Sequence, residues 1–253
     1  MALHKDQAII LSTRVFGESD KILRFFTLHS GKLTGIAKGG KKSQKRFMNT
    51  LELFNHVDLE YFEKPGKGMV RIDNADLRRP NSGIESSFKK MCIASFFAEF
   101  VDRLTREKER NEGLFNLLRE GLESVKSVEF TYSDVLYYQL RMLRHLGYMP
   151  NFETCVHCGK DLAGRERTSF SNERGGVVCT PCAQSVPHRT YPEGLLSRLA
   201  HGGNDDWAAG RNPAGGGDRA EFERHARELM EAFIHFHLNV EFKSYRLLRS
   251  VTG

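Results

Sequence analysis

The chain has 253 residues, of which 40% are hydrophobic and 28% are charged, a composition typical of a soluble globular protein with two or three compact units. No uninterrupted apolar stretch approaches the roughly 18–20 residues that a membrane-spanning helix needs, and residues 1–21 lack the apolar block of a signal peptide, so we expect a cytoplasmic protein. The formal charge is +6, and residues 1–80 carry the whole excess, with 15 Lys and Arg against 9 Asp and Glu.

Residues 1–80 show the short apolar segments and Gly-containing turns of a small barrel. From Leu51 to Tyr61 apolar residues alternate with largely polar ones, as in a strand with one buried face. The other predicted strands are 7–16, 22–28, 32–37 and 69–72. Five short strands predict an antiparallel barrel, although periodicity does not distinguish an OB-type barrel from an SH3-like one.

After Pro80 the apolar residues recur at spacings of three and four, which is the period of helices. We expect helices along 88–104 and 114–122, a third from about 133 to 146 that ends at Gly147, and a strong helix from about 219 to 240. The Gly-rich stretch 201–217 predicts a flexible loop. The helices on both sides of residues 151–186 are expected to share one core, which makes this segment an insertion.

Two Cys-x-x-Cys pairs, Cys155 with Cys158 and Cys179 with Cys182, are separated by twenty residues. Two residues between cysteines allow a tight turn to direct both thiolates at one ion, and two such turns complete a tetrahedron. Disulfides are the competing interpretation, but a reducing compartment is expected, and a redox pair would occur once. Four thiolates leave no open coordination position, which indicates one structural zinc ion. His157 is expected to face solvent.

Residues 31–50 contain several basic side chains and no acidic one. A localised positive field favours a polyanionic partner, most often nucleic acid, over a solvated basic face without a partner. Of the nearby aromatic residues, only Phe47 is kept as a candidate for stacking on unpaired bases, and most of the others, among them Phe16, are expected in the core. The candidate nucleic-acid-binding residues proposed from charge alone are Lys41, Lys42, Lys45 and Arg46.

Residues 35–42 nearly match the Walker A pattern, but Lys42 stands where a magnesium-binding hydroxyl is required. No apolar-periodic helix follows and no βαβ pattern surrounds the segment, so an NTPase is disfavoured. The histidines are scattered, and neither a nucleophile elbow nor His-Glu-x-x-His occurs. We therefore expect a protein without catalytic activity.

Several segments, in order along the chain, resemble the bacterial RecO family of recombination mediators. They include residues 14–20 (Arg-Val-Phe-Gly-Glu-Ser-Asp), 37–39 and 146–148, the two cysteine pairs, Gly175-Gly176 and Lys243-Ser244. The resemblance implies an N-terminal OB-fold, a helical domain and, in many members, a zinc module. The family's DNA contacts lie largely in the OB-fold, which implies that Lys38 is a DNA-binding residue, together with the four cations proposed from charge. It also implies that the protein binds single- and double-stranded DNA, anneals complementary strands, and interacts with single-strand-binding protein and RecR to help RecA load onto coated strands.

We therefore predict an α+β protein that acts as a DNA repair and recombination mediator and is associated with the nucleoid. Its expected domains are an OB-type barrel (1–80), a helical domain in two parts (81–150 and 187–253) and an inserted four-cysteine zinc module (151–186). Arg141 and Arg144 lie on a predicted helix and are candidates for binding a partner's acidic tail. The leading alternative is a zinc-ribbon RNA-binding module in ribosome assembly.

Overall fold

The computed structural model describes residues 2–43, 45–64, 66–127, 130–165, 168–202 and 219–252. These residues divide into two units, one made of Met1–Phe130 with Phe242–Val251 and the other of Thr131–Glu241 with Thr252–Gly253. Nearly all of the predicted flexible loop 201–217 lies outside the described residues. The domain bounds expected from the sequence stay a prediction.

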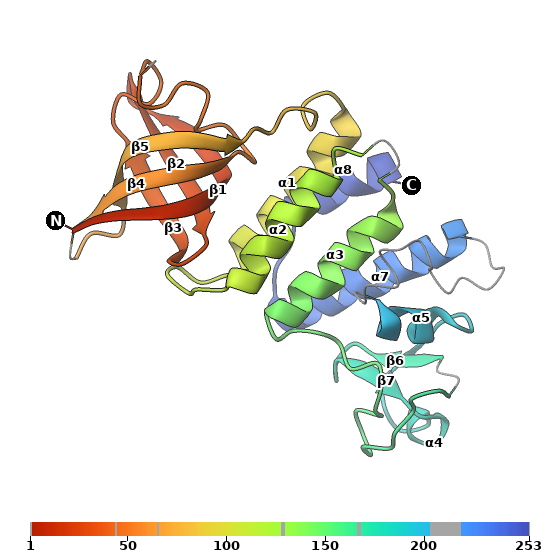
Figure 1. Cartoon of the computed structure of the whole chain (residues 1–253). Helices are drawn as coiled ribbons and strands as arrows, with labels where there is room; N and C mark the ends of the chain where they lie inside the picture. Colours follow the sequence, from red (N-terminus) through yellow and green to blue (C-terminus); the bar gives the residue numbers. More distant parts are fainter. Residues whose placement is uncertain are drawn as a thin grey trace. The chain divides into compact units, whose positions relative to one another are not determined.

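Five strands wind into a closed barrel in the first unit: β1 (Ala2–Phe16), β2 (Asp20–Thr27), β3 (Gly31–Ala37), β4 (His56–Glu63) and β5 (Val70–Arg79) (Figure 1). The strand order is β1-β2-β3-β5-β4, and β4 returns to pair with β1. Neighbouring strands are antiparallel except β3 and β5, which are parallel. This five-stranded closure is that of an OB-type barrel, as predicted.

The barrel interior is filled by every second residue of the strands. In β3 the buried residues are Gly31, Leu33, Gly35 and Ala37. A Cβ at Gly35 would lie 3.0 Å from the side chains of Ile72 and Phe25, so the absence of a side chain there leaves room for the core. The strand predicted from Leu51 to Tyr61 is only partly confirmed, because β4 begins at His56. Leu51 lies in a turn before β4, and its side chain still packs in the barrel core.

The first unit continues with α1 (Phe88–Leu104) and α2 (Glu112–Ser124), and it ends with α8 (Lys243–Thr252) beside α1 (Figure 1). Phe242, at the start of this last segment, stacks on Phe100 with ring centroids 5.2 Å apart. The Glu99 carboxylate accepts hydrogen bonds from the backbone amides of Lys243 (3.0 Å) and Ser244 (2.8 Å). Glu99 therefore satisfies free N–H groups at the first turn of α8, where negative charge is favourable.

A polar network joins the barrel to α1. The Lys32 ammonium donates to the backbone carbonyls of Asp102 and Thr105, and Arg24 pairs with the Asp102 carboxylate at 2.9 Å. Burial raises the pKa of Asp102, and the two neighbouring cations oppose that rise. The Lys32 and Asp102 side chains are largely buried, 12% and 7% exposed, so removal of either would leave a buried charge without compensation, and the network holds these elements in one unit.

The second unit contains α3 (Tyr132–His145), α5 (Leu195–His201) and α7 (Arg219–Leu238). Between α3 and α5 lie a small sheet of β6 (Ser169–Ser171), β7 (Gly176–Val178) and β8 (Arg189–Thr190), and the short helix α4 (Thr180–Ala183). As predicted, α3 stops just before Gly147, whose φ of +75° favours glycine. None of the described helices is long and apolar enough to cross a membrane.

Candidate metal site and nucleic-acid interface

The four predicted ligand cysteines converge on one point in the second unit. Cys155 and Cys158 lie in a turn that follows α3, Cys179 directly follows β7, and Cys182 lies in α4. All four Sγ atoms are within 4.8 Å of one another, and those of Cys158 and Cys179 are 3.8 Å apart. In a zinc tetrathiolate with bonds of about 2.3 Å, the edge of the tetrahedron is about 3.8 Å, so the cluster fits such an ion.

Backbone hydrogen bonds hold the first cysteine turn against the small sheet. Val156 N–H donates to the carbonyl of Val177 at 2.9 Å, and Cys179 N–H points at the Cys155 sulfur at 3.4 Å. At Gly176 a Cβ would lie 2.5 Å from both the Asn151 carbonyl oxygen and a Val156 methyl group. Gly176 is therefore required for the sheet to approach the turn this closely.

The thiols influence one another's ionisation. Burial opposes ionisation of Cys155, but hydrogen bonds from the amides of Cys179, Cys158 and His157 prevail and lower its pKa to about 6. The pKa of Cys182 is raised to about 12, first by its hydrogen bond with Cys179. Successive thiolates at this distance repel one another, and a divalent cation would relieve that repulsion. His157 is exposed and is not part of the cluster, as expected.

The basic segment of the first unit forms a loop, which we call the cationic loop and of which the structure describes residues 38–43 and 45–46. Its base is fastened to the β1–β2 turn by Asp20, whose carboxylate pairs with the Lys38 ammonium (2.6 Å) and accepts from Gly39 N–H (2.9 Å). Lys41 N–H donates to the carbonyl of Ser19 at 2.9 Å. The hydrogen bond from Lys38 and then that from Gly39 lower the pKa of Asp20, so the fastening carboxylate stays ionised.

Arg46 stabilises the conformation of this loop through contacts with other residues of the loop and the barrel. Its guanidinium donates to the backbone carbonyl of Lys38 at 2.9 Å and lies over the ring of Phe47, 4.9 Å from the centroid. A third contact, to the carbonyl of Asp73, is longer at 3.4 Å. Arg46 therefore contributes positive charge and also shapes the loop.

The remaining three predicted DNA-binding residues differ from Lys38 and Arg46 in their exposure and contacts. Lys41, Lys42 and Lys45 are exposed, and none forms an ion pair with any residue that the structure describes. Their ammonium groups are therefore available to phosphates, whereas Lys38 and Arg46 already have partners within the protein.

The aromatic residues near the loop differ from the expectation. Phe47 is only 3% exposed and belongs to the barrel core, so its predicted role in stacking is wrong. Phe16, expected in the core, is 50% exposed. The reason is that β1 and β2 stay paired out to Phe16 and Asp20, beyond the buried middle of the strands.

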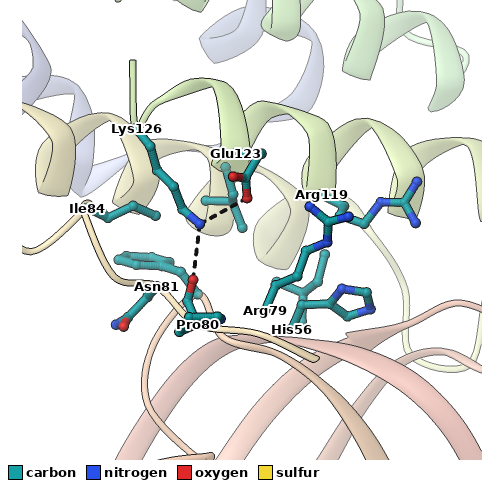
Figure 2. Close-up of a pocket in the computed structure, with 11 residues that line it drawn as sticks. His56, Arg79, Pro80, Asn81, Ile84, Arg119, Glu123 and Lys126 are labelled. Atoms are coloured by element: carbon teal, nitrogen blue, oxygen red, sulfur yellow. Dashed lines mark hydrogen bonds and ion pairs between the residues drawn. The ribbon is translucent and has the colours of Figure 1, made fainter. Parts of the chain in front are cut away.

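A second group of cations surrounds a hollow between the end of β5 and α2 (Figure 2). Arg79 and Arg119 are exposed and make no ion pair among the described residues, whereas Lys126 pairs with Glu123 at 2.9 Å. His56 lies buried beneath the two arginines. No sequence pattern indicated this group, because its members are brought together only by the packing of α2 on the barrel.

The two arginines considered for partner binding lie near the C-terminal end of α3. Arg141 lies over the ring of Tyr137, 5.1 Å from its centroid, and donates to its hydroxyl group. Arg144 is exposed. Burial, followed by the charges of both arginines, lowers the pKa of His145. This end of α3 is therefore cationic, and the role of the arginines in partner binding stays a prediction.

An OB-type barrel with a cationic loop has the features of a nucleic-acid-binding domain. The chain matches the family models "Recombination protein O N terminal" at residues 1–81 and "Recombination protein O C terminal" at residues 85–246. It is 31% identical over 247 residues to the DNA repair protein RecO of Thermoanaerobacter sp. (strain X514), with 96% of each chain covered. It is 32% identical over 252 residues to the DNA repair protein RecO of Myxococcus xanthus (strain DK1622), with 99% of each covered.

The chain therefore belongs to the RecO family of recombination proteins. Membership supports a role in DNA repair and recombination, and it agrees with the resemblance found in the sequence.

Proposed function

We propose that the protein is a recombination mediator that binds single- and double-stranded DNA through the cationic loop and anneals complementary strands without catalysing a chemical step. The observation that carries this proposal is a set of three exposed lysines, Lys41, Lys42 and Lys45, which have no ion-pair partner in the described part of the chain. They lie on a loop that Asp20 and Arg46 hold in place. Because the hydrogen bonds of Asp20 and Arg46 already hold the loop in one conformation, little conformational entropy is lost when its lysines bind DNA.

Charge neutralisation supplies the driving force for the proposed annealing. Lysines that contact phosphates release condensed counterions, which favours binding with little dependence on base sequence. Two strands held on one cationic surface repel each other less and meet at a higher effective concentration. Arg79 and Arg119, in the same unit, offer further free cations for the second strand. Such a mechanism needs no nucleotide hydrolysis.

We propose that the cysteine cluster holds one structural zinc ion. Four sulfur donors in near-tetrahedral proximity suit zinc and leave no open position for substrate or water. The ion would fold residues 151–186, whose described part contains only short strands and one turn of helix.

Family membership motivates the proposed partners. We propose that the protein meets single-strand-binding protein and RecR near the nucleoid of the cytoplasm and thereby assists RecA indirectly, with Arg141 and Arg144 contacting an acidic partner tail. The zinc-ribbon RNA-binding alternative is less favoured, because both halves of the chain match recombination-protein models.

The test reverses the three free lysines together, as Lys41→Glu, Lys42→Glu and Lys45→Glu. Each phosphate contact contributes about 0.7 to the salt dependence of single-strand binding, so loss of three contacts lowers the slope by about 2. We expect single-strand affinity at moderate salt to fall at least tenfold, measured by fluorescence anisotropy of a labelled oligonucleotide across a salt series.

A matched control carries the same charge change elsewhere in the unit, as Lys89→Glu, Arg106→Glu and Arg246→Glu, all at exposed positions. It separates a local contact from a general effect of net charge. If both triple variants lose affinity and slope equally, or if neither does, the cationic loop is not the DNA-binding surface.

A further inference from the structure

The tip of the β1–β2 hairpin carries an exposed aromatic residue that the proposed phosphate contacts do not use. Phe16 is 50% exposed and its neighbour Val15 is 55% exposed. A phenylalanine exposed to this extent at a strand end leaves apolar surface in contact with water. Its ring is thus free to meet a ligand that has an apolar face.

The hairpin register places this ring beside the base of the cationic loop. Phe16 lies directly opposite Asp20, and residues directly opposite in an antiparallel pair share a face. Asp20 in turn holds the ammonium group of Lys38 and the amide of Gly39. The aromatic ring and the loop therefore belong to one continuous surface.

A second cation lies on the same face of β1 as Phe16. Arg14 is two residues before Phe16 on β1, so its side chain leaves the same face of the strand. It is exposed, and it lines a hollow over β1, β2 and β3 together with Ile22 and Thr34. An exposed aromatic ring on a surface that also carries cations matches the chemistry of a nucleic acid strand, in which bases alternate with phosphates.

We propose that Phe16 stacks on an unpaired base of a single strand whose phosphates contact the cationic loop. This inference rests on the proposed function of the loop and adds a source of selectivity to it. Duplex DNA presents its phosphates but keeps the faces of its bases stacked inside, so Phe16 favours single strands. A base held on Phe16 also presents its pairing edge to a complementary strand. The positive surroundings favour an anionic partner over a purely apolar protein segment, and the aromatic ring beside them favours a nucleic acid, whose bases can stack, over an acidic protein segment.

The test compares Phe16→Ala with the wild-type chain on a single-stranded oligonucleotide and on a duplex of the same length, at matched salt. Loss of one stacked base costs about 1–3 kcal/mol, so we expect single-strand affinity to fall roughly 5- to 150-fold. Duplex affinity should stay within about twofold, and the salt slope should not change, because no phosphate contact is lost.

Two further variants keep the result interpretable. Phe16→Tyr retains a stacking ring and should restore single-strand affinity, whereas Phe88→Ala removes a phenylalanine that is 66% exposed on α1 and should have no effect. Oligonucleotides with 2-aminopurine report stacking directly, through quenching that Phe16→Ala removes.

Unchanged single-strand affinity in Phe16→Ala would overturn the inference, including the case in which the tip instead contacts a protein. Equal losses on single strands and duplex, with a changed salt slope, would also overturn it, because they would indicate a displaced loop. If the lysine variant loses DNA binding while Phe16→Ala does not, the proposed function stands and only the stacking role fails.

Discussion

At the scale of single residues, His56 shows how burial and charge set a protonation state. Its side chain is 5% exposed, its Nε2 is 3.1 Å from the Gln7 amide oxygen, and its ring meets Phe115 edge-on at 5.7 Å. Burial, and then the positive charge of Arg119, lower its pKa from 6.5 to about 4. The native state therefore requires the neutral imidazole.

This requirement predicts a pH dependence of stability. Because the folded pKa lies below the unfolded value, the unfolded chain binds an extra proton between pH 6.5 and 4, and the free energy of unfolding falls as the pH falls through this window. A shift from 6.5 to about 4 corresponds to about 3 kcal/mol at most. We expect urea unfolding of His56→Gln to depend less on pH than that of wild type. Identical pH profiles would contradict the buried neutral state.

Residue roles were predictable from the sequence to different extents. The ligand set Cys155, Cys158, Cys179 and Cys182 was predictable because two spaced pairs encode a metal geometry locally, and the structure brings all four together. The sequence did not predict that Phe16 is exposed and Phe47 is buried. The exposure of Phe16 depends on how far the β1–β2 pairing extends, and the burial of Phe47 depends on which side of a loop packs against the core.

At the scale of elements, apolar periodicity located α1, α2, α3 and α7 because each has a continuous buried stripe. For β4, apolar periodicity predicted a start at Leu51, which is too early in the chain. It gave no indication of α8, whose first turn is held by Glu99, about 145 residues earlier in the chain. Ser244, part of the family resemblance, also donates its hydroxyl group to the Glu99 carboxylate, which explains a serine at this position. Pairings over such separations have no local sequence signal.

If the proposed zinc ion is bound, the four-cysteine module should be the element whose stability depends most on it. Chelation of zinc should increase amide hydrogen exchange in the described part of 151–186, because this segment has little secondary structure to hold it. Metal analysis should give one zinc ion per chain, and single-strand affinity should stay within about twofold after chelation. Loss of DNA binding together with the metal would instead mean that the module shapes the DNA surface.

At the scale of the whole molecule, the charge is separated from the metal site. Residues 1–80 hold the entire net charge of +6, and they form the barrel of one unit, whereas the cysteine cluster belongs to the other. The proposed division of labour follows from this separation, with DNA contacts on the barrel and a folding role for the metal.

The central claim, that the cationic loop brings DNA strands together, is tested most directly by annealing. Complementary oligonucleotides coated with single-strand-binding protein are mixed with wild type, with the Lys41/Lys42/Lys45→Glu variant or with the charge-matched control, and duplex formation is followed by fluorescence energy transfer. We predict that the loop variant anneals at least tenfold more slowly than wild type while the control stays within about twofold. Annealing by the loop variant at the wild-type rate would contradict the account.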